Sequence, residues 1–146
     1  MRDRMSILLV EDNPDDVELT LRAFKKNQFD NQVVVARDGA QALDYLFARG
    51  DFADKNPKEL PGLILLDLKL PKVDGLEVLR EVRGAPETRR IPVVILTTSD
   101  HQADVTSGYD LGVNSYIKKP VDFDAFLHTI KGLGSYWLGL NTPPVS

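Results

Sequence analysis

Five short apolar runs, each followed by a polar turn and a segment with helical spacing, constrain the fold of this chain most strongly. The runs are Ile7–Val10, Val33–Ala36, Leu63–Leu66, Val93–Leu96 and Tyr116–Ile117. Strands that alternate with helices are typical of a parallel sheet, and a strand covered on both faces is apolar at nearly every position. At 146 residues the chain has the length of one domain. The pattern therefore predicts an α/β fold with helices on both faces of a parallel sheet.

The segments between the runs carry apolar residues at the three- and four-residue spacing of amphipathic helices. Examples are Val17, Leu21 and Phe24 in the first segment and Phe126, Ile130 and Leu133 in the last. The segment Gln102–Leu111 has a poor apolar stripe and contains Val, Thr, Ser and Gly, so we expect it to be the least stable helix and a moving part.

Two polar residues stand where helices are expected to begin. Asn13 precedes Pro14, which suits the first position of a helix, and Asp122 precedes the last helical segment. Asp15 and Asp16 then fall in a first helical turn, where acids interact favourably with the helix dipole. We interpret these two acids as helix-start residues.

Composition excludes several classes of protein. The formal net charge of −4 disfavours nucleic acid and anionic membranes as partners. The absence of cysteine rules out disulfides, a thiol nucleophile and thiolate metal sites. No apolar run approaches the roughly 18 residues of a membrane helix, and the first residues lack the pattern of a signal peptide. We therefore expect a cytoplasmic protein.

Polar residues collect where the predicted strands end. Glu11 and Asp12 follow the first strand and Asp67 the third, whereas three hydroxyl residues, Thr97, Thr98 and Ser99, follow the fourth, and Lys118, Lys119 and Pro120 follow the fifth. Ligands of open parallel sheets bind at that edge, so these side chains are expected to meet there. Closely spaced carboxylates repel one another unless a cation or a raised pKa relieves them, and an all-oxygen cluster suits Mg²⁺. An aspartate beside such a metal can attack phosphorus to form an aspartyl phosphate.

Four sequence blocks in this order resemble the receiver domain of two-component response regulators. They are Ile7-Leu8-Leu9-Val10-Glu11-Asp12, Leu65-Leu66-Asp67-Leu68-Lys69-Leu70-Pro71 with Asp74-Gly75, Pro92-Val93-Val94-Ile95-Leu96-Thr97, and Tyr116-Ile117-Lys118-Lys119-Pro120. The resemblance covers about Ile7 to Leu133. It implies a flavodoxin-like, doubly wound sheet of five parallel strands in the order 2-1-3-4-5.

The resemblance also implies roles for individual residues. Asp67 would accept a phosphoryl group from a histidine kinase and, with Glu11, Asp12 and the backbone carbonyl of Lys69, would bind Mg²⁺. Thr97 and Lys119 would contact the phosphoryl group. Thr97 would also act with the aromatic Tyr116 as a conformational switch, and Pro120 would follow a cis peptide bond. The protein would be a signalling phosphoacceptor that catalyses only its own phosphorylation and dephosphorylation.

A narrower likeness comes from the first turn and the end of the chain. The Glu11–Asp16 opening, the long segment 49–61 and the aromatic tail after about residue 134 look most like the stand-alone regulators that partner bacterial phytochrome kinases. We therefore expect residues 1–146 to form one receiver domain without an output domain. We also hypothesise a homodimer formed through the tail or through the face of the fourth and fifth helices.

Three other functions compete with this interpretation. A Mg²⁺-dependent phosphatase with an aspartyl nucleophile would usually place a second carboxylate two residues after the nucleophile, but Lys69 stands there. A flavin-binding module would need a phosphate loop where the acidic run begins at Glu11. A receiver-like module that is never phosphorylated remains the third alternative, although Asp67, Asp12 and Lys119 are all present.

Overall fold

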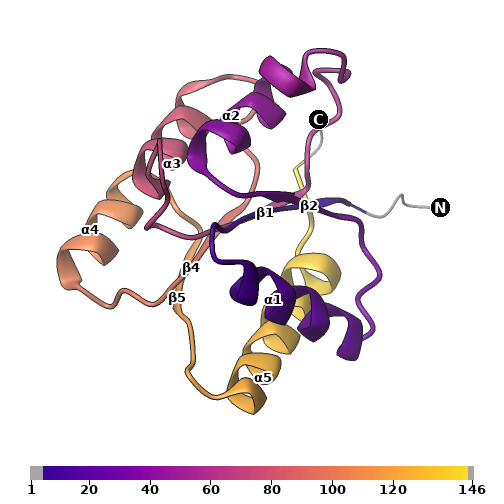
Figure 1. Ribbon diagram of the computed structural model, residues 1–146, viewed down its shortest axis with the longest axis vertical. Coiled ribbons are helices and arrows are strands. Elements are labelled where there is room, and N and C mark those ends of the chain that lie inside the picture. The colour runs from indigo at the N-terminus through magenta and orange to yellow at the C-terminus, as the bar shows by residue number, and fades with distance from the viewer. Residues whose placement is uncertain (1–4, 145–146) are drawn as a thin grey trace.

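The computed structural model describes residues 5–144 and joins the five strands in one parallel sheet (Figure 1). The strand order is β2-β1-β3-β4-β5, which confirms the predicted order 2-1-3-4-5. The strands are β1 Ile7–Val10, β2 Val33–Ala36, β3 Leu63–Leu66, β4 Val93–Thr97 and β5 Ser115–Lys118. The helices are α1 Pro14–Lys26, α2 Gly39–Phe47, α3 Gly75–Gly84, α4 Gln102–Asp110 and α5 Phe123–Gly134. A short 3₁₀ helix, Gly50–Phe52, follows α2, and a π-helix, Ser135–Leu140, continues α5.

Both predicted helix caps are present. The side chain of Asn13 accepts hydrogen bonds from the backbone amides of Asp15 at 2.9 Å and Asp16 at 3.3 Å. The side chain of Asp122 accepts from the amide of Ala125 at 3.0 Å. These bonds satisfy amide groups that a helix leaves unpaired at its first turn.

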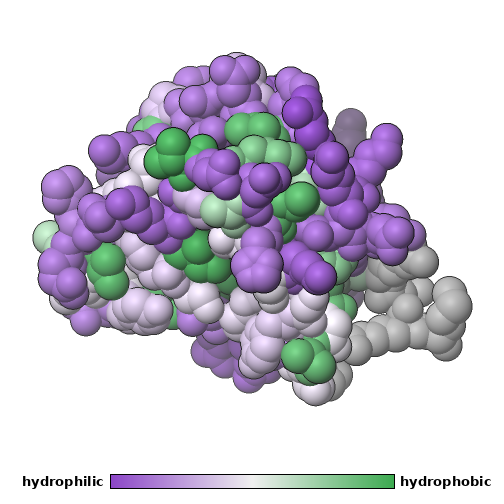
Figure 2. Space-filling view, turned by 90° about the horizontal axis from the view of Figure 1, so that it is seen from below, coloured by the Kyte–Doolittle hydropathy of each residue, from purple (hydrophilic) through white to green (hydrophobic). Residues whose placement is uncertain are grey.

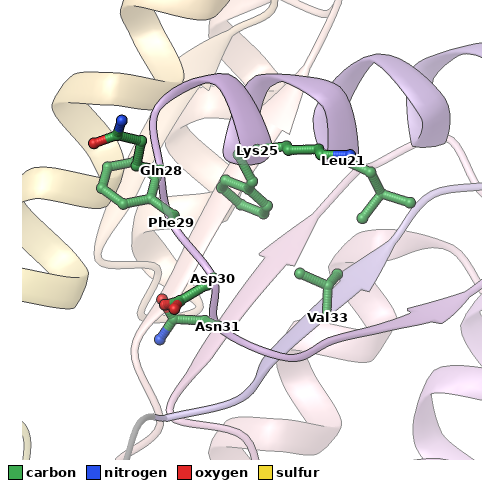
Figure 3. Close-up of a pocket in the computed structure, with 8 residues that line it drawn as sticks. Leu21, Lys25, Gln28, Phe29, Asp30, Asn31 and Val33 are labelled. Carbon is green, nitrogen blue, oxygen red and sulfur yellow. The ribbon is translucent and has the colours of Figure 1, made fainter.

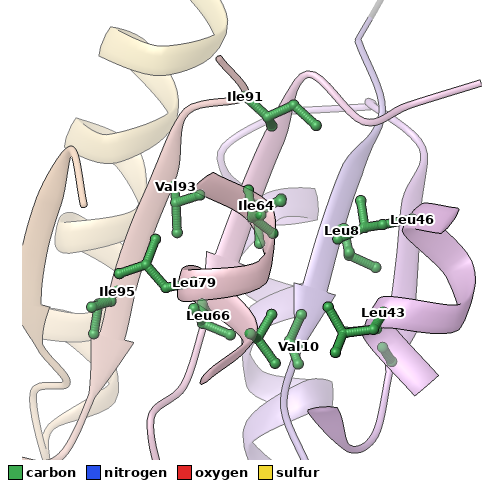
Figure 4. Close-up of a cluster of buried hydrophobic side chains, with 14 of the residues drawn as sticks. Leu8, Val10, Leu43, Leu46, Ile64, Leu66, Leu79, Ile91, Val93 and Ile95 are labelled. Atoms are coloured by element: carbon green, nitrogen blue, oxygen red, sulfur yellow. The ribbon is translucent and has the colours of Figure 1, made fainter. Parts of the chain in front are cut away.

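The sheet has an apolar layer on each face because successive strand side chains point to opposite sides. On one face, strand residues such as Leu8, Ile64 and Ile95 pack with α2 and α3 (Figure 4). On the other face, strand residues such as Leu9 and Leu65 pack with α1 and α5. This layering fixes the carboxyl ends of β1, β3, β4 and β5 along one edge.

The helix α4 is the most loosely packed of the five. Gly108 is its one buried residue, and His101 at its N-cap makes no side-chain capping bond. By contrast, α3 buries Gly75, Val78, Leu79 and Val82. The structure thus shows that α4 buries fewer residues than α3, and its expected low stability stays a prediction.

The segment 49–61 and the C-terminal tail both pack partly on the domain. In the first, the ring of Phe52 stands edge-on to Tyr45 with centroids 5.2 Å apart. In the tail, Trp137 packs against the core layer of α1 and α5, whereas Leu140 remains 78% exposed. The tail thus packs partly on the domain and leaves an apolar side chain exposed.

One face of the molecule carries small groups of hydrophobic residues. Seen from below, several of these groups lie near the middle of the face, among hydrophilic residues (Figure 2). Within residues 5–144 no helix has both the length and the apolar character needed to cross a bilayer.

The first residue of α3 provides a test of how closely this helix packs on the loop after β3. A Cβ on Gly75 would lie 2.2 Å from the carbonyl oxygen of Asp67, whereas a Cβ on Gly84 in the same helix would meet nothing within 4 Å. We expect Gly75→Ala to lower the free energy of unfolding by about 1–3 kcal/mol through overpacking. Gly84→Ala should leave it unchanged or raise it slightly, because alanine favours helix more than glycine does. Urea denaturation followed by circular dichroism measures both, and equal stability of the two variants would contradict the packing described.

Candidate functional site

The carboxyl ends of β1 and β3 bring the first two acids together. Val10 and Leu66, the last residues of the two strands, are paired in the parallel register. The amide of Asp67 donates to the carbonyl of Val10 at 3.0 Å, which places Asp67 beside Glu11. The two side chains therefore meet because of strand register and not because of any local sequence contact.

Three carboxylates form the centre of the site. Glu11, Asp12 and Asp67 each offer an oxygen, and these atoms lie within 4.8 Å of one another. Glu11 is buried, Asp67 is half-buried and Asp12 is exposed, so the cluster opens to solvent on one side. Carboxylate oxygens are the ligands that hard divalent cations such as Mg²⁺ and Mn²⁺ prefer. The donor set therefore fits a divalent metal ion.

Lys119 lies against this cluster with a side chain that is only 7% exposed. Its ammonium group hydrogen-bonds to Glu11, to Asp16 Oδ2 at 3.0 Å and to Asp67 Oδ2 at 3.2 Å. The neighbouring Lys118 points outward and pairs with Asp100 at 2.9 Å. The structure thus distinguishes the two adjacent lysines and places Lys119 in the site.

Burial and neighbouring charges shift the pKa values of Glu11 and Lys119. Burial raises the pKa of Glu11 from 4.5 to about 7, despite its hydrogen bond to Lys119. Burial alone would lower the pKa of Lys119, but the hydrogen bond to Glu11 and the charges of Asp67 and Glu11 outweigh it and raise that pKa. Lys119 is therefore positively charged at neutral pH, and it is the cation that the buried acids share.

Asp16 is a member of the site that the sequence interpretation missed. We expected this acid to serve only the start of α1, but its carboxylate forms an ion pair with Lys119 at 3.0 Å. One signal was available: Asp16 stands four residues after Asp12, and the first turn of a helix that follows a strand end lies at the same edge of the sheet. Asp15, in contrast, remains an exposed helix-start residue.

The expectation of a cis peptide bond before Pro120 is wrong for this structure. Within residues 5–144 every peptide bond is trans. The trans form is favoured at X–Pro bonds by about 0.5–1 kcal/mol, and Lys119 reaches all three carboxylates from it. The amide of Lys119 also donates to the carbonyl of Thr97 at 2.6 Å, which ties the end of β5 to that of β4.

The two residues expected to switch lie on adjacent strands beside the acids. Thr97 is fully buried at the end of β4, and its hydroxyl oxygen accepts from the amide of Ser99 at 3.4 Å. Tyr116 on β5 is half-buried, and its hydroxyl donates to the carbonyl of Ser99 at 2.9 Å. Ser99 in turn donates to Asp104 of α4 at 2.6 Å. A chain of hydrogen bonds therefore links Tyr116 to the loosely packed helix.

Lys69 lies in the exposed loop after Asp67. The amide of the intervening Leu68 donates to Asp67 Oδ1 at 2.7 Å, which fixes the acid against the start of this loop. The role expected for the carbonyl of Lys69 stays a prediction.

One of two cavities lies beside the acids. It has a volume of about 280 Å³ and is lined by residues that include Asp16, Lys119, Pro120 and Phe123. A larger one of about 500 Å³ lies between the end of α1 and the start of β2, and its lining includes Leu21, Phe29 and Val33 (Figure 3). The second cavity is at the opposite end of the sheet from the acids and contributes no group to them.

Comparisons with known sequences agree with this arrangement. The family model of the response regulator receiver domain matches residues 7–131. The probable methanogenesis regulatory protein FilR2 of Methanothrix harundinacea is 43% identical over 142 residues, which cover 97% of this chain and 89% of FilR2. Response regulator Rcp1 of Synechocystis is 41% identical over 140 residues, which cover 96% of this chain and 93% of Rcp1.

Solved structures of similar sequence share the fold. The phosphorylated cyanobacterial phytochrome response regulator RcpA has a TM-score of 0.90 and 41% identity, and the match covers 98% of this chain and 100% of RcpA. The Mn²⁺-bound form of Rcp1 has a TM-score of 0.88 and 40% identity, with 97% and 99% covered. The bacteriophytochrome response regulator RtBRR has a TM-score of 0.78 and 53% identity, with 97% and 85% covered.

The ion pairs of Lys119 lead to a stability prediction. Lys119→Met leaves the buried carboxylates without their cation, and breaking a buried pair typically costs about 3–5 kcal/mol. We expect urea denaturation to show a loss of this size, part of which Mg²⁺ restores by neutralising the same acids. Lys118→Met is the matched control, because it removes only the exposed pair with Asp100. Unfolding of the two variants at the same urea concentration would contradict the site geometry. So would an increase in stability on adding Mg²⁺ that is no larger for either variant than for the native chain.

Proposed function

Because this chain belongs to the response regulator receiver family, we propose that Asp67 is its phosphoacceptor and that a sensor histidine kinase supplies the phosphoryl group. As a receiver, the chain is a signalling phosphoacceptor of two-component systems and not an enzyme that turns over a metabolite. The observation that carries the proposal is the position of Asp67, which is half-buried beside Glu11 and Asp12 and 3.2 Å from the ammonium of Lys119. A carboxylate so placed can act as a nucleophile toward phosphorus.

The proposed reaction is an in-line phosphoryl transfer. A carboxylate oxygen of Asp67 forms a bond to phosphorus as the phosphorus–nitrogen bond of the kinase phosphohistidine breaks, and the imidazole leaves with the bonding electrons. The Lys119 ammonium lies where it can offset negative charge on the phosphoryl oxygens. The hydroxyl of Thr97 is the proposed second donor to those oxygens.

We propose Mg²⁺ as the metal, held by Glu11, Asp12, Asp67 and the backbone carbonyl of Lys69. When bound, it would supply positive charge that offsets the charge of the acids and of the phosphoryl group. The carboxylate cluster and the Mn²⁺-bound form of the related Rcp1 support this assignment.

The proposed output is a change in the β4–α4 region. Phosphorylation adds negative charge at the end of β3, one strand away from the buried Thr97. A shift of Thr97 toward that charge would alter the loop at Ser99, to which Tyr116 and Asp104 are hydrogen-bonded. Since α4 buries little apolar surface, it is the element that such a change moves most easily.

For partners, we propose a bacterial phytochrome kinase upstream and protein targets downstream, in the cytoplasm. The likeness to RcpA, Rcp1 and RtBRR supports the first. The net charge of −4 supports proteins rather than nucleic acid as the downstream targets. We propose that residues 1–146 act as one receiver domain, because one sheet joins all five strands.

We propose in addition that the tail mediates a homodimer. Tyr136 near the start of the π-helix and Leu140 at its end are 47% and 78% exposed, and a second copy could cover them. We expect the chain to sediment as a dimer and the Tyr136→Ser, Leu140→Ser double variant to shift toward monomer. Val121→Ser is the control, because Val121 is fully exposed but lies in the loop before α5. A monomer in analytical ultracentrifugation, with and without phosphorylation, would exclude the dimer.

The phosphoacceptor is tested by intact-mass spectrometry after incubation with acetyl phosphate and Mg²⁺. We expect one phosphate adduct that requires the metal and is absent from Asp67→Asn. Asp100→Asn should keep the adduct, because Asp100 is an exposed acid at the same edge that pairs with Lys118.

Failure of the native chain to form the adduct would favour the module that is never phosphorylated. That conclusion also requires that the native chain does not bind beryllofluoride. If beryllofluoride binds although no adduct is seen, the phosphate adduct forms but hydrolyses quickly.

A further inference from the structure

Asp16 is the third residue of α1, and its carboxylate is directed to the end of β5 rather than to solvent. Its Oδ2 lies 3.0 Å from the Nζ of Lys119, closer than the 3.2 Å from Asp67 Oδ2. The Asp16 side chain is 31% exposed, so a helix residue on the rim reaches into the site to meet an almost buried ammonium.

The start of α1 does not require this carboxylate. Asn13 caps the helix through its side chain, which accepts from the amides of both Asp15 and Asp16. The hydroxyl of Thr20 bonds to the backbone carbonyl of Asp16, not to its carboxylate. Asp15 shares the first turn but forms no ion pair with any residue in the range 5–144. The ion pair is therefore particular to Asp16 and not a general property of the acids at this helix end.

Asp16 differs from the other two acceptors of Lys119 in one respect. An ammonium group has three N–H donors, and Glu11, Asp16 and Asp67 accept them. Glu11 and Asp67 belong to the carboxylate cluster that fits a metal ion, whereas Asp16 is outside that cluster. Metal binding and phosphoryl transfer both change the bonding of Glu11 and Asp67, but neither requires a change at Asp16.

We propose that Asp16 is a positioning residue that keeps the Lys119 ammonium beside Asp67 while the other two carboxylates change partners; this rests on Asp67 being the phosphoacceptor. A cavity of about 280 Å³ borders the ion pair between Asp16 and Lys119, and its lining also includes Pro120 and Phe123. Without the Asp16 carboxylate, the freed N–H group faces this water-accessible space, and the ammonium is drawn away from Asp67. Phosphoryl oxygens then lose part of the positive charge that the site holds ready for them.

The kinetic test compares phosphorylation by acetyl phosphate in Asp16→Ala, Asp16→Asn and the control Asp15→Ala. Misplacing a charged group lowers the rate of the chemical step more than ligand binding, so we expect Asp16→Ala to reduce the saturating rate constant about fivefold or more. The half-saturating concentration should change less than about twofold. Asp16→Asn should recover most of the rate because its amide oxygen still accepts an N–H bond. Asp15→Ala should match the native chain.

A second measurement observes Lys119 directly and without phosphorylation. In nitrogen-15 NMR, an ammonium held by three acceptors exchanges slowly with water and gives a resolved NH₃⁺ signal, which Lys119→Met identifies by its loss. We expect the signal in the native chain, Asp15→Ala and Asp16→Asn, and its loss by fast exchange in Asp16→Ala. Circular dichroism confirms that each variant is folded.

The outcomes separate this inference from the proposed function. If the native chain is phosphorylated on Asp67 and Asp16→Ala matches Asp15→Ala in rate, the positioning role is overturned and the phosphoacceptor stands. A persistent NH₃⁺ signal in Asp16→Ala overturns it equally. If the native chain takes no phosphate, the proposed function fails, and the positioning role fails with it.

Discussion

A lysine ammonium that is almost wholly buried has to meet negative charge, and Lys119 meets Glu11, Asp16 and Asp67. The acids have the opposite requirement, because carboxylates crowded at one edge repel one another unless a cation lies among them. The end of β5 supplies the ammonium, the ends of β1 and β3 supply two acids, and the first turn of α1 supplies the third. The pairing thus makes these segments depend on one another, and it exists only once the sheet is complete.

The rest of the fold packs tightly behind that edge, whereas one helix beside it buries little. Leu8, Ile64 and Leu65 are fully buried between helices, so the strands that carry the acids cannot shift without exposing core. The helix α4 is different because Gly108 is its one buried residue and a hydrogen bond from Ser99 to Asp104 joins it to the site edge. A phosphoryl group added at Asp67 would therefore lie at the end of a tightly packed strand and near the loosely packed helix α4. A conformational switch requires this combination.

The sequence predicted the strands and the caps at Asn13 and Asp122, because each follows from local composition and periodicity. The strand order, in contrast, was implied by the resemblance to receiver domains. The sequence also predicted that Glu11, Asp12, Asp67 and Lys119 lie at one edge of the sheet, since parallel strands end at the same side. Asp16 was misjudged because an acid in a first helical turn has a sufficient local explanation in the helix dipole. The peptide bond before Pro120 was misjudged because proline permits both isomers and the surrounding structure selects one.

Periodicity and the residues after each strand thus determined the class of fold and the chemistry of the site, because both depend on side-chain type and spacing along the chain. Tertiary structure alone decided that Asp16 joins Lys119 and how Tyr116, Ser99 and Asp104 are linked. These are contacts between residues far apart in sequence or on different elements, and their partners are fixed by strand register and helix packing. A carboxylate has the same local preference whether or not an ammonium lies 3.0 Å away, so the position of Asp16 in the sequence could place it near the edge of the sheet but could not identify its partner.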